Sequence, residues 1–101
     1  MHKISVQFQK VGSEWRFRAE TSGFEIDGFI SRELLDDEVG DDSSDDERKA
    51  YLIEHEQEIG MTALMKAREV AERPMAERIP YVGATRAQLA EGVHVRSVRE
   101  R

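Results

Sequence analysis

The chain contains no cysteine and only two prolines, and aromatic residues make up 7% of its 101 residues. Without cysteine there is neither a disulfide framework nor a thiolate that could act as a nucleophile or metal ligand. No apolar run approaches the roughly 18 residues that a membrane-spanning helix needs, and the first residues lack the apolar stretch of a signal peptide. We therefore expect one soluble domain over residues 1–101, with the cytoplasm as its location.

Charge is abundant but unevenly distributed along the chain. Charged residues make up 36% of the sequence and hydrophobic residues 39%, which is polar for a globular protein but too apolar for a wholly disordered one. The formal net charge of −6 is the sum of +3 for residues 1–19, −12 for residues 20–60 and +3 for residues 61–101. The acidic middle of the chain would repel a nucleic-acid backbone, whereas the two ends would tolerate one.

Three short runs near the start alternate between apolar and polar residues, which is the period of a half-buried strand. Turns that contain Gly12 and Gly23 separate these runs. The sequence therefore predicts an antiparallel meander with one apolar face. The apolar positions are Ile4, Val6 and Phe8 in the first run, Trp15, Phe17 and Ala19 in the second, and Phe24, Ile26, Gly28 and Ile30 in the third.

Capping signals mark the helices that follow. Ser31 is suited to cap a short helix over residues 32–35. Ser44 and Glu47 have the spacing of a capping box, in which each side chain bonds the backbone amide of the other residue. The segment between these helices, residues 36–46, is predicted to be an acidic loop because its dense like charges repel one another.

The helix that begins at the Ser44 cap is predicted to run from about Asp45 to Arg73, where Pro74 would stop it. Gly60 is a candidate position for a break or bend in this helix. A second capping box over residues 85–88 predicts a short helix that ends near Gly92.

Residues 93–101 fit either a fourth strand or a flexible tail, and their periodicity does not decide between them. The expected fold class is α+β: a three- or four-stranded antiparallel sheet packed against one long helix and one or two short helices. We expect the core to contain the apolar positions of the strands and one stripe of the helices, namely Ile4, Val6, Phe8, Trp15, Phe17, Phe24, Ile26, Ile30, Leu34, Leu52, Ile59, Leu64 and Val70.

The acidic segment is the main candidate for a functional surface. An EF-hand loop that began at Asp41 would need glycine at position 6 and glutamate at position 12, but those positions hold Asp46 and Leu52. Three interpretations remain open: a solvating loop, a phosphorylation site at Ser43 or Ser44, and a set of carboxylates that imitates a phosphate backbone and occupies a basic nucleic-acid-binding cleft on a partner. The carboxylates concerned are Asp36, Asp37, Glu38, Asp41, Asp42, Asp45, Asp46 and Glu47.

No pattern in the sequence indicates catalysis, a metal or a cofactor. His55 lies between two glutamates, but a zinc-protease helix needs a second histidine four residues later, and that position is Ile59. There is no nucleophile elbow and no glycine-rich phosphate loop. We therefore assign no catalytic residue, no metal ligand and no cofactor.

Basic residues define the alternative surface, which would bind nucleic acid. Sheet-type RNA readers place aromatic residues on their open face, and only Phe29 is predicted to lie there. The simpler interpretation is that these arginines pair with the protein's own carboxylates. The residues of this alternative nucleic-acid face are Lys3, Arg16, Arg18, Arg86, Arg96 and Arg99.

The stretch from Trp15 to about Glu72 resembles the YrdB-like family of small uncharacterised bacterial proteins. The resemblance rests on residues 15–20 (WRFRAE) and 24–35 (FEIDGFISRELL), followed by an acidic loop and a charged helix that contains Ile59, Ala63 and Lys66. It implies an α+β arrangement of strands, a short helix and a longer helix. It implies no activity, because the family offers no catalytic residues to carry over.

The expected function is that of a non-enzymatic protein-interaction module or inhibitor that acts through the acidic segment. Its partner would be a protein with a basic surface, and no membrane is involved. The alternative is a nucleic-acid-associated regulator that uses the basic sheet face and the arginines after residue 85. Salt dependence would separate the two, because phosphate binding weakens steeply as salt concentration rises.

Overall fold

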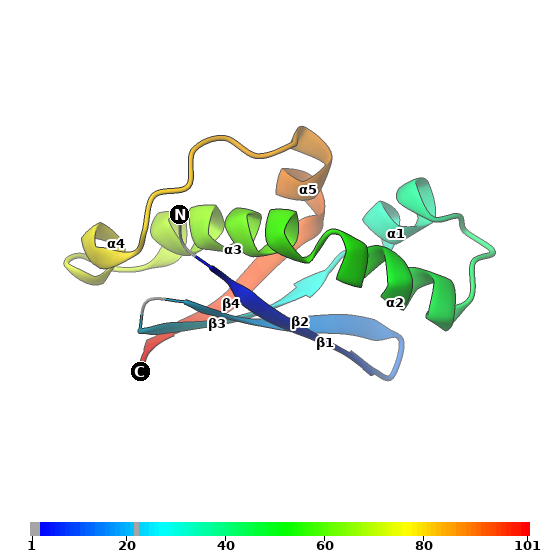
Figure 1. Cartoon of the computed structure of the whole chain (residues 1–101), viewed down its shortest axis with the longest axis horizontal. Coiled ribbons are helices and arrows are strands. Elements are labelled where there is room, and N and C mark those ends of the chain that lie inside the picture. Colours follow the sequence, from blue (N-terminus) through cyan, green and yellow to red (C-terminus); the bar gives the residue numbers. More distant parts are fainter. Residues whose placement is uncertain (1–2, 22) are drawn as a thin grey trace.

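The computed structural model describes residues 3–21 and 23–101. A four-stranded antiparallel sheet forms one layer, and Figure 1 shows the helices gathered on one face of it. This arrangement confirms the predicted α+β class. The elements follow in the order β1 (Ser5–Val11), β2 (Glu14–Thr21), β3 (Phe24–Ile30), α1 (Arg32–Glu38), α2 (Asp45–Glu54), α3 (Glu56–Val70), α4 (Met75–Arg78), α5 (Ala87–Gly92) and β4 (Val93–Glu100).

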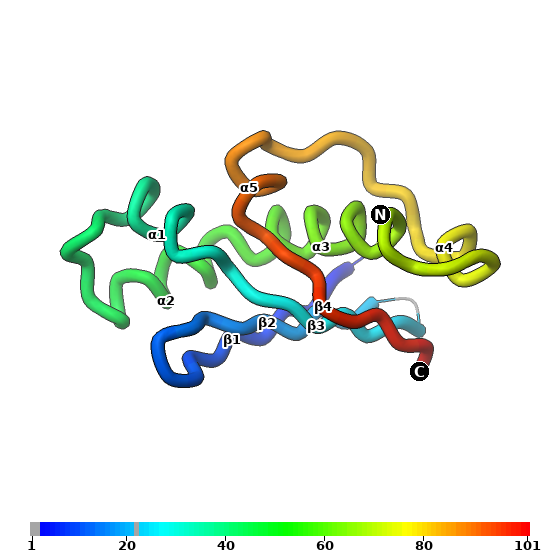
Figure 2. The backbone as a smooth tube through the Cα atoms, turned by 180° about the vertical axis from the view of Figure 1, so that it is seen from behind, coloured from blue at the N-terminus to red at the C-terminus, as the bar shows by residue number. Residues whose placement is uncertain are grey.

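The sheet has the strand order β1-β2-β3-β4, so the predicted meander is extended by a strand from the end of the chain. Residues 93–100 form β4, which pairs antiparallel with β3 and leaves a register shift at Asp27 and Gly28. In Figure 2, β4 leads away from α5 and lies beside β3. Val93 is fully buried and Val95 and Val98 pack against the core, which explains why this segment is a strand and not a tail.

The core lies between the sheet and the helices. Twelve of the thirteen predicted core residues are buried or packed against the buried cluster, and among them Phe8 is only partly buried. Val70 is the exception, since its side chain is 58% exposed. The core-facing stripe of α3 contains Ile59, Ala63 and Ala67, and Val70 lies in the final turn beyond them.

The predicted long helix is in fact two helices, and it breaks at His55 and not at Gly60. His55 has backbone angles (φ −103°, ψ 22°) outside the helical region, and it separates α2 from α3. Gly60 lies inside α3, where a Cβ atom would come within 2.7 Å of Ile4 Cγ2. The glycine therefore lets the helix pack closely on β1. The helix also stops at Val70, before the predicted Arg73.

The first two capping predictions are confirmed, and the third is wrong. The Ser31 hydroxyl accepts a hydrogen bond from the Leu34 amide, and Ser44 and Glu47 form the reciprocal capping box. At α5 the N-cap residue is Arg86, and no side chain caps the helix. The Thr85 hydroxyl instead contacts Met65 Sδ at 3.8 Å, which ties this connection to α3.

The helices of the described residues are too short or too polar to cross a membrane.

Candidate functional site

The candidate site is the connection from α1 to α2 together with the helix turns on either side, residues 36–47, which we call the acidic turn. Its predicted description as a loop is only partly correct. Residues 36–38 belong to α1 and residues 45–47 to α2, so the irregular part spans only residues 39–44. Gly40 has φ +127°, a conformation that favours glycine, and its amide donates to the Leu35 carbonyl.

A single arginine from α2 holds the acidic turn in place. The Arg48 Nη2 donates to Asp36 Oδ1 (2.6 Å) and to the Gly40 carbonyl (3.0 Å), and Arg48 Nε donates to Ser43 Oγ (2.8 Å). The Arg48 side chain is only 11% exposed, so solvent screens these bonds weakly. This guanidinium connects the end of α1, the connection and the start of α2, and it explains why so acidic a segment is ordered.

Four of the eight predicted carboxylates are engaged within the protein. Asp36 binds Arg48, and Asp45 Oδ1 lies 2.7 Å from Lys10 Nζ of β1. Glu38 accepts a hydrogen bond from the Tyr51 hydroxyl (3.4 Å), and Glu47 forms the capping box with Ser44. The bond from the Ser44 amide lowers the pKa of Glu47. These four residues build the turn and anchor it to its surroundings.

The other four carboxylates, Asp37, Asp41, Asp42 and Asp46, are exposed. None of them forms an ion pair with a residue that the structure describes. Because Arg48 fixes the backbone beneath them, these carboxylates are displayed on an ordered surface. We call them the displayed carboxylates. They are the part of the acidic turn that is open to solvent.

The alternative nucleic-acid face is not one surface. Arg86 lies beside the helices, where its guanidinium contacts Glu58 of α3 at 2.9 Å. Lys3 is exposed and precedes β1. The remaining members, Arg16, Arg18, Arg96 and Arg99, lie on the strands of the sheet and each contacts a carboxylate.

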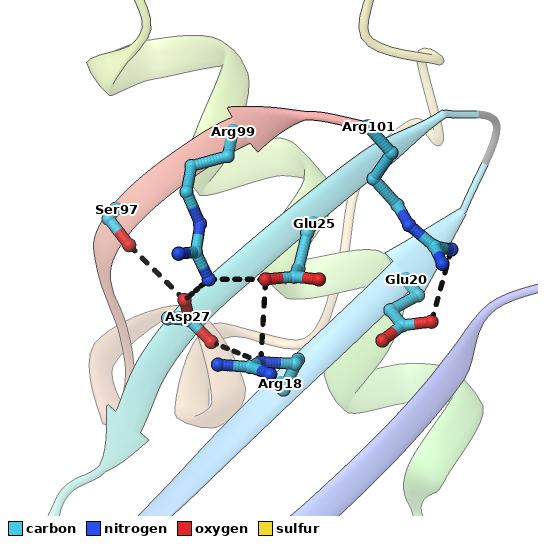
Figure 3. A network of polar contacts seen from close by, with 7 residues as sticks. All are labelled: Arg18, Glu20, Glu25, Asp27, Ser97, Arg99 and Arg101. Atoms are coloured by element: carbon cyan, nitrogen blue, oxygen red, sulfur yellow. Dashed lines mark hydrogen bonds and ion pairs between the residues drawn. The ribbon is translucent and has the colours of Figure 1, made fainter.

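On the open face of the sheet the arginines are therefore paired with carboxylates of the protein and do not form a free basic patch. Figure 3 shows Arg18 and Arg99 on either side of Glu25 and Asp27, with Ser97 beside them. Arg18 Nε lies 2.9 Å from Asp27 Oδ1, and Arg99 Nη2 lies 2.7 Å from Asp27 Oδ2. Arg101 contacts Glu20 at 3.1 Å. A phosphate group would have to compete with these carboxylates for the charge of the arginines.

One cluster on this face was not predicted from the sequence. The rings of Phe29 and His94 stack with centroids 4.8 Å apart, and the Arg96 guanidinium lies 4.3 Å from the Phe29 centroid. Phe29 and His94 are far apart in the sequence, and they become neighbours only because β4 pairs with β3. Arg96 also donates two hydrogen bonds to Glu14, each 2.7 Å long.

Glu14 is expected to make the stability of the protein depend on pH. The hydrogen bonds from Arg96, followed by the one from Arg16, lower the pKa of the Glu14 carboxyl. A carboxyl whose pKa is lower in the folded than in the unfolded protein stabilises the fold at pH values above its unfolded pKa. This stabilisation disappears as the pH falls through the folded pKa, because the carboxyl is then protonated in both states. We expect the urea midpoint to fall less between about pH 6 and about pH 3 in Glu14→Gln than in the wild type.

Glu91→Gln is the matched control, since Glu91 is an exposed carboxylate of α5. It should follow the wild-type pH profile in the same urea titrations. Identical profiles for Glu14→Gln and the wild type would show that the Arg96 bridge does not contribute to stability in solution.

Within residues 3–21 and 23–101, no three His, Asp or Glu side chains are grouped so that they could hold a metal ion. Comparisons of the chain with models of known protein families, with curated proteins and with solved structures find no match. The resemblance to the YrdB-like family therefore stays a prediction.

Proposed function

We propose that this protein is a non-enzymatic interaction module whose acidic turn binds a basic surface on a protein partner, with the cytoplasm as its location. The observation that carries the proposal is the Arg48 contact set, which orders the turn and leaves Asp37, Asp41, Asp42 and Asp46 exposed. A surface that is ordered before binding avoids part of the entropy cost of association.

The electrostatics of the chain support the same proposal. The displayed carboxylates carry four negative charges that form no ion pair with the described residues, in a chain whose net charge is −6. Such a field speeds encounter with a basic partner and repels an acidic one. The nucleic-acid alternative has weaker support, because the arginines of the open sheet face already contact carboxylates of the protein.

An affinity capture from host lysate tests the proposal with three baits: the wild type, an acid variant and a control variant. The acid variant is Asp37→Asn/Asp41→Asn/Asp42→Asn/Asp46→Asn. The control carries Glu54→Gln/Glu69→Gln/Glu72→Gln/Glu91→Gln, which removes four exposed carboxylates elsewhere. Both variants change the net charge from −6 to −2, so they differ only in where the charge is lost.

We expect a protein partner that survives nuclease treatment and remains on the wild-type and control baits. With that partner purified, the acid variant should raise Kd about 10- to 100-fold, because each surface ion pair contributes up to about 1 kcal/mol. If both variants lost binding equally, the loss would depend on the net charge and not on the position of the carboxylates. That result would contradict the proposal. Captured material that nuclease removes would instead favour the arginines of the sheet.

A further inference from the structure

The sheet has two edges, β1 and β4, and only one of them is protected. An exposed strand edge presents unpaired backbone groups, and proteins commonly block it with charged side chains or a β-bulge. β4 has both features. It carries Arg96, Arg99 and Glu100, and its register with β3 shifts at Asp27 and Gly28. A further strand would meet charge and irregular geometry there.

The β1 edge lacks these features over most of its length. Residues 5–9 (SVQFQ) contain no charged side chain, and β1 pairs with β2 in an unbroken register. No other strand in the described part of the chain pairs with its outer side. Figure 1 shows this outer side of β1 at the front of the sheet. Lys10 is the one charged residue of the strand, and its ammonium is held by Asp45 of α2.

The hydrogen-bond pattern shows which backbone groups of β1 point outward. The Arg101 amide donates to the Gly23 carbonyl, and the Ser31 amide to the Gly92 carbonyl. Odd-numbered residues of β3 therefore bond to β4, and even-numbered residues bond to β2, because the two directions alternate along a strand.

The same alternation carries through the β2 pairing to β1. Ser5, Gln7 and Gln9 bond to β2, and Ile4, Val6, Phe8 and Lys10 direct their backbone groups outward. The Ile4 carbonyl already accepts a hydrogen bond from Gln57 Nε2 (2.7 Å). The free stretch of the edge thus runs from Val6 to Lys10, and its centre is Phe8.

The Phe8 side chain is also only partly covered by other residues of the protein. It lies on the helix-covered face of β1, as Val6 does, but Val6 is 6% exposed whereas Phe8 is only partly buried. A strand added at this edge would place a side chain beside the Phe8 ring. An aromatic neighbour directly opposite is among the favourable cross-strand pairs.

We propose that two copies of the chain pair through their β1 edges, antiparallel about a two-fold axis at Phe8, and join their sheets into one. In this register Phe8 faces Phe8 of the second copy, Gln7 faces Gln9, and Lys10 faces Val6. No like charges meet, and the free backbone groups from Val6 to Lys10 exchange hydrogen bonds. A second copy is the occupant that this self-complementary stretch fits, and such isologous contacts are the common form of dimer.

Sedimentation velocity of the wild type from about 1 µM to about 1 mM tests the proposal, since small interfaces give weak, reversible dimers. We expect a concentration-dependent rise from the 11.6 kDa mass of one chain towards twice that mass. Gln7→Glu/Gln9→Glu should weaken dimerisation at least about 10-fold, because the introduced carboxylates face each other across the axis. In the monomer, Arg18 and Arg16 of β2 lie directly opposite positions 7 and 9. Their positive charges would balance the introduced carboxylates, so the variant monomer should stay folded.

Two further samples make the result specific to this edge. Ala87→Glu/Gln88→Glu adds carboxylates on exposed α5 positions and should dimerise like the wild type. Gln7→Lys/Gln9→Lys should fail to dimerise alone, but it should form a heterodimer when mixed with Gln7→Glu/Gln9→Glu. A wild type that stays monomeric at about 1 mM, or a Gln7→Glu/Gln9→Glu variant that dimerises like the wild type, would overturn the proposal.

Discussion

Gly28→Ala is expected to destabilise the fold by about 3 kcal/mol, enough to lower Tm by roughly 15 °C. A Cβ atom at position 28 would lie 1.9 Å from the His94 carbonyl oxygen and 2.6 Å from the Phe17 ring. The first of these contacts is with backbone, so no side-chain rotation can relieve it. Gly28 therefore allows β4 to approach β3 at the register shift and lets Phe17 fill the core beneath it.

Urea or thermal unfolding measures this effect, and Gly12→Asn is the control. Gly12 has φ +64°, and a Cβ atom at this position would have no other atom within 4 Å. Asparagine tolerates this backbone conformation better than most residues. We expect the control to stay within about 1 kcal/mol of the wild type. If Gly28→Ala were equally mild, β4 would have to be able to shift away from β3.

Arg48→Met is expected to cost about 2 kcal/mol and to release the acidic turn. Methionine preserves much of the apolar stem but removes the donors to Asp36, Ser43 and the Gly40 carbonyl. Backbone amides of residues 39–44 should then exchange hydrogen faster, which hydrogen-exchange mass spectrometry measures. Binding of a basic partner should weaken as well, because the partner would have to order the turn.

Lys49→Met is the matched control, since it removes one positive charge from the neighbouring, exposed position of α2. We expect its unfolding free energy to stay within about 0.5 kcal/mol of the wild type and its exchange pattern to be unchanged. Unchanged exchange in Arg48→Met itself would mean that the caps of α1 and α2 order the turn without the guanidinium.

Local signals predicted much of the fold. The three alternating runs became β1, β2 and β3, since apolar residues spaced by two positions must share one face of a strand. Ser31 and Ser44 start helices as predicted, because a cap involves only the residue and the following turn. Thr85 has a similar spacing to Gln88 but does not cap α5, since its hydroxyl contacts Met65.

The candidate site was predicted only in outline. The sequence places eight carboxylates in one short segment, but it does not show which of them are free. That division depends on partners that are distant in the sequence, such as Lys10 for Asp45. The arginines of the sheet show the same limit, because Arg96 meets Glu14 only after β4 has joined the sheet. Residue 48 gave no signal in the sequence, since its role is defined by three contacts in space.

The sequence by itself determined the α+β class, the starts of α1 and α2 and the location of the negative charge, because each of these depends on neighbouring residues. Only the tertiary structure decided that residues 93–100 are a strand and that the predicted long helix breaks at His55. It also decided which carboxylates remain exposed. The physical reason is that strand pairing, burial and ion pairs are interactions between distant segments, whose free energy exists only once the chain has folded.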